Sequence, residues 1–176
     1  MTLAIIRKES GTYALVFRSA HVFEAPIGRL GVLPIRRGYY VYVGSAFGPG
    51  GVYARVARHV SHSPRRHWHV DYLWPALQIV EVWYSHDPVL REHQWARALR
   101  AMGSSIPLLH FGASDCRCES HLTFFRRRPS IQSFRMQLRG TDQDRILAAR
   151  APGGRAIRKN TDPTPANSAT MVKPVR

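Results

Sequence analysis

GYYVYVGSA, residues 38–46, is the stretch of this sequence that says most about its fold. Valine and tyrosine in alternation favour a pleated strand, here expected over residues 39–43. In such a strand Tyr40 and Tyr42 share one face, and Tyr39, Val41 and Val43 share the other. A strand of this kind can be core alone, so the residues around it decide whether its tyrosines carry chemistry.

Working outward from this strand, short apolar segments are separated by turn and helix signals, which together predict an α/β (α+β) fold. Asp87 followed by Pro88 is an N-cap with proline at the first helical position, so a helix is expected to begin there and to end at Gly103. The other expected elements are a strand over 11–19, a hairpin over 20–38, a Gly/Pro loop over 44–51, a helix over 51–60, an alternating strand over 67–74, a strand over 78–86, and strand–turn–strand over 106–127.

The charge of the chain is strongly positive, with a formal net charge of +15 over 176 residues. Residues 1–125 hold 14 Lys and Arg against 8 Asp and Glu, and residues 126–176 hold 12 against 3. An excess of this size favours a polyanionic partner, because each neutralised phosphate releases counterions. The alternative is a soluble basic protein without a dedicated partner.

Composition also divides the chain after residue 125. Residues 1–125 are expected to fold as one domain, and residues 126–176 to form a basic, largely disordered extension with one weak helix. No apolar run is long enough to predict a signal peptide or a membrane span. Cys116 and Cys118 are one residue apart, which is poor spacing for a structural disulfide, so a reducing cytoplasm is the expected compartment.

Two expected helices place charged side chains beside apolar ones. In the helix over 51–60, Arg55 and His59 are four residues apart and therefore neighbours, while Arg58 is rotated away. In the later helix, Glu92 precedes Trp95 by three residues and so lies on or beside the apolar face. A carboxylate there needs a partner, which is either an ion pair, with Arg55 as the obvious cation, or a bound metal.

The order Gly-Thr-Tyr (11–13), Tyr-Val-Gly (42–44), Arg55-x-x-x-His59 and then Glu92 resembles the GIY-YIG nuclease family. The resemblance covers roughly residues 8–125. The phrases GSAFGPGG, RHWHVDYLW and HFGASDCRCESHL resemble a bacterial and archaeal branch of that family, some of whose members are fused to endonuclease III-type repair enzymes. The family fold is a small, mostly antiparallel central sheet flanked by helices.

The resemblance implies hydrolysis of a DNA phosphodiester with one divalent ion, Mg²⁺ or Mn²⁺. Tyr13 or Tyr42 would activate the water, with a pKa lowered by the metal and Arg55. Arg55 would stabilise the transition-state charge, Glu92 would hold the metal, and His59 would orient a tyrosine or the water. The nucleic-acid contacts expected around this set are Gly44, Ser45, Arg58, Arg65, Arg66, His67, His69 and Asp115.

The sequence departs from the family pattern at two places. The spacer between the GTY and YVG elements is longer, which is consistent with the hairpin expected over 20–38. The asparagine that often completes the family site has no counterpart, because Asn160 and Asn167 both lie in the tail. Asp115, Ser120 and His121 are the candidates to substitute for it.

Cys116, Cys118 and His121 form a C-x-C-x-x-H pattern, and thiolates with imidazoles suit four-coordinate zinc. The alternative is two small buried thiols with hydrogen-bonded histidines, and a zinc site is the less expected of the two. His67, His69 and Asp71, if they share a strand face, would line the nucleic-acid groove.

Two functions follow as hypotheses. The first is a metal-dependent DNA endonuclease acting in DNA repair or processing, with RNA as another substrate and a repair enzyme as a conceivable partner. The second is a non-catalytic nucleic-acid-binding module on the same fold, with structural zinc from the Cys and His residues. Glu92 discriminates between them, because a binding module has no reason to place a carboxylate beside phosphate.

Overall fold

The structure is a computed structural model, and it describes residues 5–61, 66–74, 76–102, 105–138 and 146–150. Its centre is a five-stranded sheet in the order β6–β4–β1–β5–β7, in which every neighbouring pair is antiparallel. The strands are β1 (Gly11–Ser19), β4 (Gly38–Ala46), β5 (Gln78–Ser85), β6 (Leu122–Phe125) and β7 (Leu147–Arg150). The predicted antiparallel α+β fold is confirmed.

The central pair of strands brings the GTY and YVG segments together. β1 and β4 run antiparallel with Tyr13 opposite Gly44 and Leu15 opposite Tyr42. The segment that begins one strand therefore lies beside the segment that ends the other. The strand predicted over 39–43 is longer than expected, since Gly44 and Ser45 continue its pairing with β1 and do not begin the loop.

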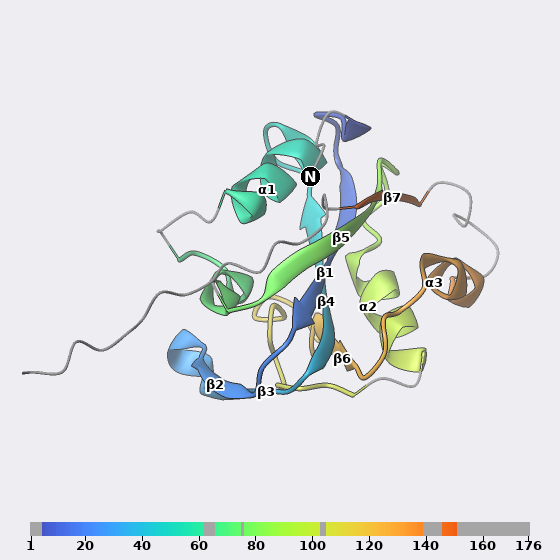
Figure 1. Ribbon diagram of the computed structural model, residues 1–176. Helices are drawn as coiled ribbons and strands as arrows, with labels where there is room; N and C mark the ends of the chain where they lie inside the picture. Colours follow the sequence, from blue (N-terminus) through green and yellow to red (C-terminus); the bar gives the residue numbers. More distant parts are fainter. Residues whose placement is uncertain (1–4, 62–65, 75, 103–104, 139–145, 151–176) are drawn as a thin grey trace, which may run out of the picture.

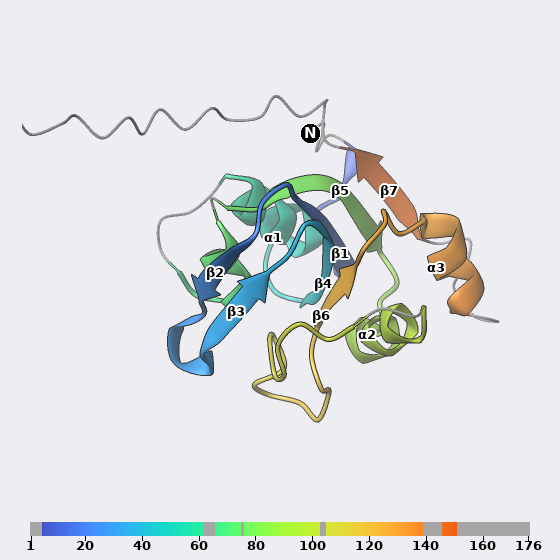
Figure 2. The same ribbon diagram turned by 60° about the horizontal axis from the view of Figure 1, so that its bottom comes forward.

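The two faces of the sheet carry separate hydrophobic clusters. On one face Leu15 and Phe17 pack under α1 (Gly51–Val60) and the hairpin of β2 (Phe23–Pro26) and β3 (Val32–Ile35), which is closed by the short 3-10 helix η2 (Gly28–Leu30). On the other face Val16 and Val41 pack under α2 (Glu92–Ala101) and α3 (Ile131–Gln137). Figures 1 and 2 show α1 and the hairpin on one side of the sheet and α2 and α3 on the other.

Three predicted elements differ from the structure. Residues 67–74 do not form a strand but contain a 3-10 helix, η3 (His69–Leu73). The helix expected to begin at Asp87 begins only at Glu92, because the Asp87 carboxylate accepts hydrogen bonds from Val89 N and Arg91 Nε and holds a turn instead. Of residues 106–127 only Leu122–Phe125 is a strand, and the segment before it is a looped connection of turns and bends.

The fold continues past the predicted boundary at residue 125. Helix α3 begins at the Ser130 cap, and its Phe134 stacks on Trp83 of β5 at 5.1 Å between ring centroids. Strand β7, which was not predicted, pairs with β5 at the sheet edge. The described fold therefore reaches Arg150, and the disorder expected over 151–176 concerns residues outside the described part. No helix among the described residues is long and apolar enough to span a membrane.

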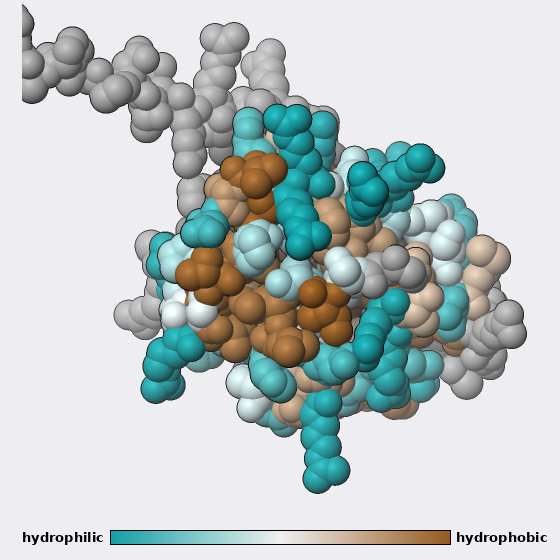
Figure 3. Space-filling model, turned by 90° about the horizontal axis from the view of Figure 1, so that it is seen from below, coloured by the Kyte–Doolittle hydropathy of each residue, from teal (hydrophilic) through white to brown (hydrophobic). Residues whose placement is uncertain are grey.

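The surface is not uniformly charged. Seen from below, toward the side where β2 and β3 lie in Figure 1, hydrophobic residues gather in a patch bordered by hydrophilic side chains (Figure 3). The large hydrophobic side chains exposed on the protein include Val22 and Val32 at the hairpin, and Leu109 in the connection before β6.

Candidate active site

A pocket of about 420 Å³ opens where the GTY end of β1 meets the YVG end of β4. Its lining comes from both strands, from α1, from the segment around η3, from the start of α2 and from the connection before β6. The lining residues are Tyr13, Tyr42, Gly44, Ser45, Arg55, His67, Trp68, His69, Glu92, Gly112, Ser114 and Asp115. Tyr13, Tyr42, Arg55 and Glu92, four of the five predicted catalytic residues, thus share one pocket.

Two glycines make room for the tyrosine rings. A Cβ on Gly44 would lie 2.6 Å from the ring of Tyr13, which is closer than real Cβ contacts allow. A Cβ on Gly112 would lie 2.7 Å from the ring of Tyr42, and the φ of +70° at this position also favours glycine. Glycine in the YVG segment is therefore needed because the ring of its cross-strand neighbour Tyr13 occupies the space of a side chain.

His59 lies behind Tyr13 and not in the pocket itself. The side chain is buried, its Nε2 is 2.9 Å from the Tyr13 hydroxyl, and its Nδ1 is 3.5 Å from an Asp71 carboxylate oxygen. Burial lowers the pKa of His59, so the ring is neutral at pH 7. With the Nδ1 proton facing Asp71, Nε2 is free to accept the hydrogen bond that the Tyr13 hydroxyl donates.

Asp71 is a functional candidate whose position sequence reasoning misjudged. Alternation predicted that it would face the groove, whereas in η3 its carboxylate turns inward and accepts hydrogen bonds from His67 N, Trp68 N and Arg58. Burial raises the pKa of Asp71, but the contacts with His59 and with the two backbone N–H groups outweigh it and bring the pKa down to about 2. Asp71 is therefore ionised behind His59.

The two pocket tyrosines have pKa values above the ordinary value of a tyrosine. For Tyr13 and for Tyr42, burial of the ring is the largest cause and raises the pKa. The positive charge of Arg55 lowers both pKa values, but not enough to offset burial. Both tyrosines are therefore neutral at pH 7, and a proton acceptor is needed to activate either one.

Arg55 reaches the pocket from α1 and is held there by an aromatic ring. Its guanidinium carbon lies 4.5 Å from the centroid of Trp68, and Arg58 approaches the same ring at the same distance. Among the described residues Arg55 forms no ion pair with Glu92, so that predicted pairing is absent. Both arginines thus contact Trp68, but only Arg55 lines the pocket.

Glu92 is the first residue of α2, and its side chain is 16% exposed. One carboxylate oxygen lies 3.2 Å from His121 Nδ1. Glu92 and Asp115 are the two acidic residues of the pocket lining, and Ser45 and Ser114 add hydroxyl oxygens. Oxygen donors of this kind fit a hard divalent cation such as Mg²⁺ or Mn²⁺.

A second group of chemically active side chains lies next to this pocket and is called the Cys/His cluster below. It comprises His93, Cys116, Cys118 and His121, whose ligand atoms all lie within 4.8 Å of one another, so they could hold a metal ion. Sequence reasoning identified the last three as a possible metal site. It missed His93. The only feature of the sequence that could have indicated this residue is its position next to Glu92.

The predicted nucleic-acid contacts are only partly brought together. Arg58 turns to Asp71, and Arg66 lies over the ring of Tyr72, 4.9 Å from its centroid. Arg65 falls outside the described residues. Those that line the pocket are Gly44, Ser45, His67, His69 and Asp115.

The three candidates for the missing asparagine also separate. Asp115 lines the pocket. Ser120 is buried, and its hydroxyl accepts a hydrogen bond from Leu122 N and lies within donating distance of the backbone carbonyls of Phe111 and Leu122. His121 contacts Glu92. Asp115 is therefore the only one of the three that lines the pocket.

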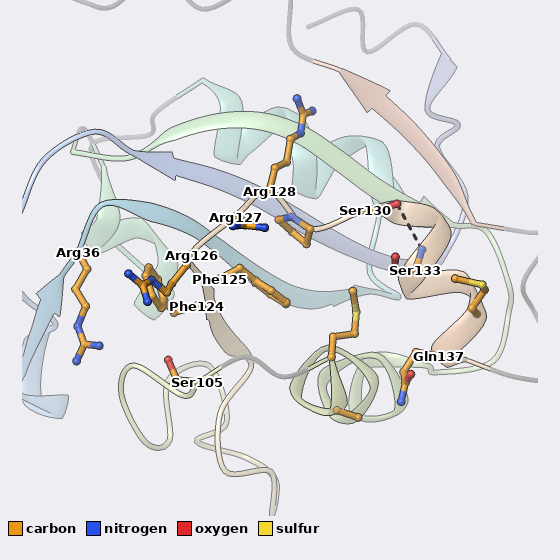
Figure 4. Close-up of a pocket in the computed structure, with 14 residues that line it drawn as sticks. Arg36, Ser105, Phe124, Phe125, Arg126, Arg127, Arg128, Ser130, Ser133 and Gln137 are labelled. Atoms are coloured by element: carbon orange, nitrogen blue, oxygen red, sulfur yellow. Dashed lines mark hydrogen bonds between the residues drawn. The ribbon is translucent and has the colours of Figure 1, made fainter.

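A larger pocket, about 1230 Å³, lies away from the tyrosines, between β6, α2 and α3. It is lined by four arginines, Arg36, Arg126, Arg127 and Arg128. Figure 4 shows Arg128 extending away from the others across the sheet, and its guanidinium pairs with Glu81 at 2.9 Å. The lining of this basic pocket includes serine hydroxyls but no carboxylate, imidazole, thiol or amine that could serve as a general base, so it suits anion contact better than catalysis.

The family model described as domain of unknown function DUF123 matches residues 12–141. That range holds every residue of the pocket and of the Cys/His cluster. No curated protein and no solved structure matches the chain.

Proposed function

The chain belongs to the DUF123 domain family, and we propose that it is a metal-dependent endonuclease of the GIY-YIG type that hydrolyses DNA phosphodiester bonds. The observation that carries the proposal is the shared pocket of Tyr13, Tyr42, Arg55 and Glu92. These residues come from distant parts of the sequence. Core packing alone gives no reason to gather two hydroxyls, a guanidinium and a carboxylate at one opening.

The first requirement of phosphodiester hydrolysis is a group that takes the proton of the attacking water. The Tyr13 hydroxyl can do so only if it passes on its own proton, because its pKa is raised by burial. His59 Nε2, at 2.9 Å, is the acceptor, and the ionised Asp71 behind the ring stabilises the imidazolium that forms. The series Tyr13, His59, Asp71 thus forms a proton path that leads out of the pocket into the protein.

The second requirement is positive charge for the pentavalent phosphate. Arg55 supplies two N–H donors in a fixed plane, and Trp68 restricts its orientation. The carboxylates of Glu92 and Asp115 would hold the divalent cation, which supplies Lewis-acid stabilisation of phosphate oxygens when bound. Asp115 thereby takes the place of the asparagine that the family pattern often provides.

The third requirement is affinity for the DNA backbone outside the pocket. The net charge of +15 supplies it, and Arg126 and Arg127 extend the basic surface on the side of β6. Contacts of this kind neutralise phosphates without reading sequence, so they give binding that weakens with salt. Repair or processing of DNA, together with a repair-enzyme partner, is the biological setting that we propose.

A cleavage assay with Glu92→Gln tests the proposal. Wild-type protein is incubated with supercoiled plasmid and with a branched DNA, in Mg²⁺, in Mn²⁺ or in EDTA. We expect metal-dependent nicking by the wild type and a fall of about 10²–10³-fold in rate in Glu92→Gln, since the charge of the cation's ligand is removed. Glu119→Gln is the matched control, because Glu119 is a surface carboxylate that pairs with Arg100.

DNA binding by both proteins is measured in parallel by fluorescence anisotropy. Binding without cleavage by the wild type on either substrate would replace the nuclease with the second hypothesis, a nucleic-acid-binding module. Equal nicking by wild type and Glu92→Gln would remove Glu92 from the site. Cleavage of an RNA of the same branched form would widen the substrate class.

A further inference from the structure

We infer that the Cys/His cluster is a tetrahedral zinc site, separate from the divalent cation of the proposed reaction. Cys118 Sγ lies 3.2 Å from His93 Nδ1, and Cys116 Sγ lies 3.4 Å from His121 Nε2. Zinc with Zn–S of about 2.3 Å and Zn–N of about 2.0–2.1 Å spaces neighbouring tetrahedral ligand atoms by about 3.3–3.8 Å. The two sulfur–nitrogen pairs already have nearly this spacing.

The donor set selects zinc over the hard cations of phosphate chemistry. Two thiolates and two imidazoles are soft and borderline donors, whereas Mg²⁺ prefers oxygen. On binding, each thiol releases its proton, and the two thiolates balance the charge of the ion. Two separate S–H···N hydrogen bonds would satisfy the same groups in pairs, but they would not require the four ligand atoms to converge within 4.8 Å.

The position of the cluster gives the zinc a structural purpose. Residues 106–121 contain no helix or strand, and loops longer than about 12–15 residues without secondary structure are uncommon. The backbone bonds that hold this loop include His110 N to Glu119 O and His121 N to Phe111 O. A zinc ion would join Cys116 and Cys118 of the loop to His93 on α2.

The cluster also touches the candidate active site, and this part of the inference rests on the proposed function. With His121 Nε2 on zinc, the proton of the ring is on Nδ1, which faces Glu92 at 3.2 Å. A carboxylate, a histidine and a metal in series fix the histidine tautomer and the ring orientation. His121 is thus a positioning residue that holds the Glu92 carboxylate at the pocket.

Metal analysis of the purified full-length chain tests the site independently of any activity. We expect one zinc per chain by atomic emission. After exchange with Co²⁺, we expect the thiolate-to-cobalt charge-transfer band and the intense visible bands of a tetrahedral site. The double variant Cys116→Ser/Cys118→Ser is expected to lose the zinc and the charge-transfer band. His21→Ala, which removes an exposed histidine outside the cluster, is expected to keep both.

Two results would overturn the zinc site. One is wild-type protein with reduced thiols that neither retains zinc nor develops the cobalt bands. The other is an unchanged cobalt spectrum in the double variant. Because the cobalt titration is made on the wild type, the test stands even where a cysteine variant fails to fold. Thiol titration adds a check, since zinc-bound thiolates react only after a chelator is added.

The link to Glu92 is tested with two substitutions of His121. His121→Ala removes both ring nitrogens, whereas His121→Asn keeps an N–H donor near the position of Nδ1 and removes the zinc ligand at Nε2. If His121 positions Glu92, the Mg²⁺ concentration for half-maximal nicking rises in His121→Ala and is partly restored in His121→Asn. Equal Mg²⁺ dependence in the two variants would leave the zinc site standing and remove this coupling. Failure of the nuclease assay would leave the metal analysis unaffected.

Discussion

The candidate active-site pocket and the Cys/His cluster meet at the start of α2, where Glu92 faces one and His93 belongs to the other, yet they are built differently. Five of the twelve pocket residues, including both tyrosines and Arg55, stand on β1, β4 and α1, whose inward sides are packed into the core. Three of the four cluster residues lie in the connection before β6. The hydrophobic core therefore fixes the tyrosine side of the pocket, whereas under our inference a bound zinc would fix the cluster.

The largest expected effect is a loss of nicking activity in Tyr13→Phe without a loss of stability. Tyr13→Phe removes the hydroxyl that contacts His59, and we expect nicking to fall about 10²–10⁴-fold, the usual contribution of a general base. The cobalt spectrum of the cluster and the thermal midpoint are expected to stay close to wild type, because the ring still fills its place. Single-turnover assays measure the rate of nicking, and circular dichroism melts measure the thermal midpoint.

Two further tyrosine variants complete this test. Tyr42→Phe shows whether the second pocket tyrosine shares the role of base, and full activity in both Tyr13→Phe and Tyr42→Phe would remove the tyrosines from the mechanism. Tyr53→Phe is the control, because Tyr53 is a partly buried tyrosine on α1 outside the pocket lining.

A smaller effect is expected from crowding the pocket. In Gly44→Ala the new Cβ would meet the Tyr13 ring at 2.6 Å, so the ring or the strand pair must move, at a cost of about 1–3 kcal/mol of unfolding free energy. Urea denaturation measures this change. Gly48→Ala is the matched control, since its nearest contact is the end of the Arg55 side chain at 3.9 Å. Equal stability of the two variants would mean that the ring does not need this space.

Asp71, the buried carboxylate behind His59, is expected to make the free energy of unfolding depend on pH. The folded pKa of Asp71, about 2, lies below its ordinary value of 3.8. The stabilisation is therefore complete above about pH 4 and disappears as the pH falls toward 2, because the unfolded chain binds the proton first. We expect about 1–2 kcal/mol from this group. In Asp71→Asn we expect the free energy of unfolding at pH 7 to fall by this amount. We also expect the free energy, measured by urea denaturation at a series of pH values, to decrease less steeply below pH 4. If the unfolding free energy of the variant decreases below pH 4 as steeply as that of the wild type, Asp71 is not the cause of the decrease.

The smallest effect is expected from substitutions outside both the active-site pocket and the Cys/His cluster. Arg126→Ser/Arg127→Ser should weaken DNA binding and lower the slope of log K against log salt by about 0.9 for each phosphate that is no longer neutralised. The rate of cleavage at saturating DNA should stay the same, since neither residue lines the active-site pocket. Anisotropy titrations between low and physiological salt measure the slope. An unchanged slope would show that DNA does not run over this surface.

Regular elements account for what the sequence predicted well. Strand 11–19 and helix 51–60 have the predicted bounds, because a continuous run of strand-forming residues and the valine stripe of Val52 and Val56 are local signals of burial. Local signals of this kind also placed Tyr13, Tyr42, Arg55 and Glu92 on the correct elements. They failed for Asp71, where three hydrogen bonds to the carboxylate favour a 3-10 turn over the extended alternation.

By itself the sequence determined the main strand and helix segments, the order of the motif and the basic charge, since these depend on side-chain pattern and composition, and the family resemblance implied that the sheet is antiparallel. Only the tertiary structure decided that His59 stands between Tyr13 and Asp71, that His93 completes the Cys/His cluster, and that β7 joins the sheet beyond residue 125. These contacts join residues far apart in the chain, and the path of an irregular loop has no periodicity from which they could be predicted.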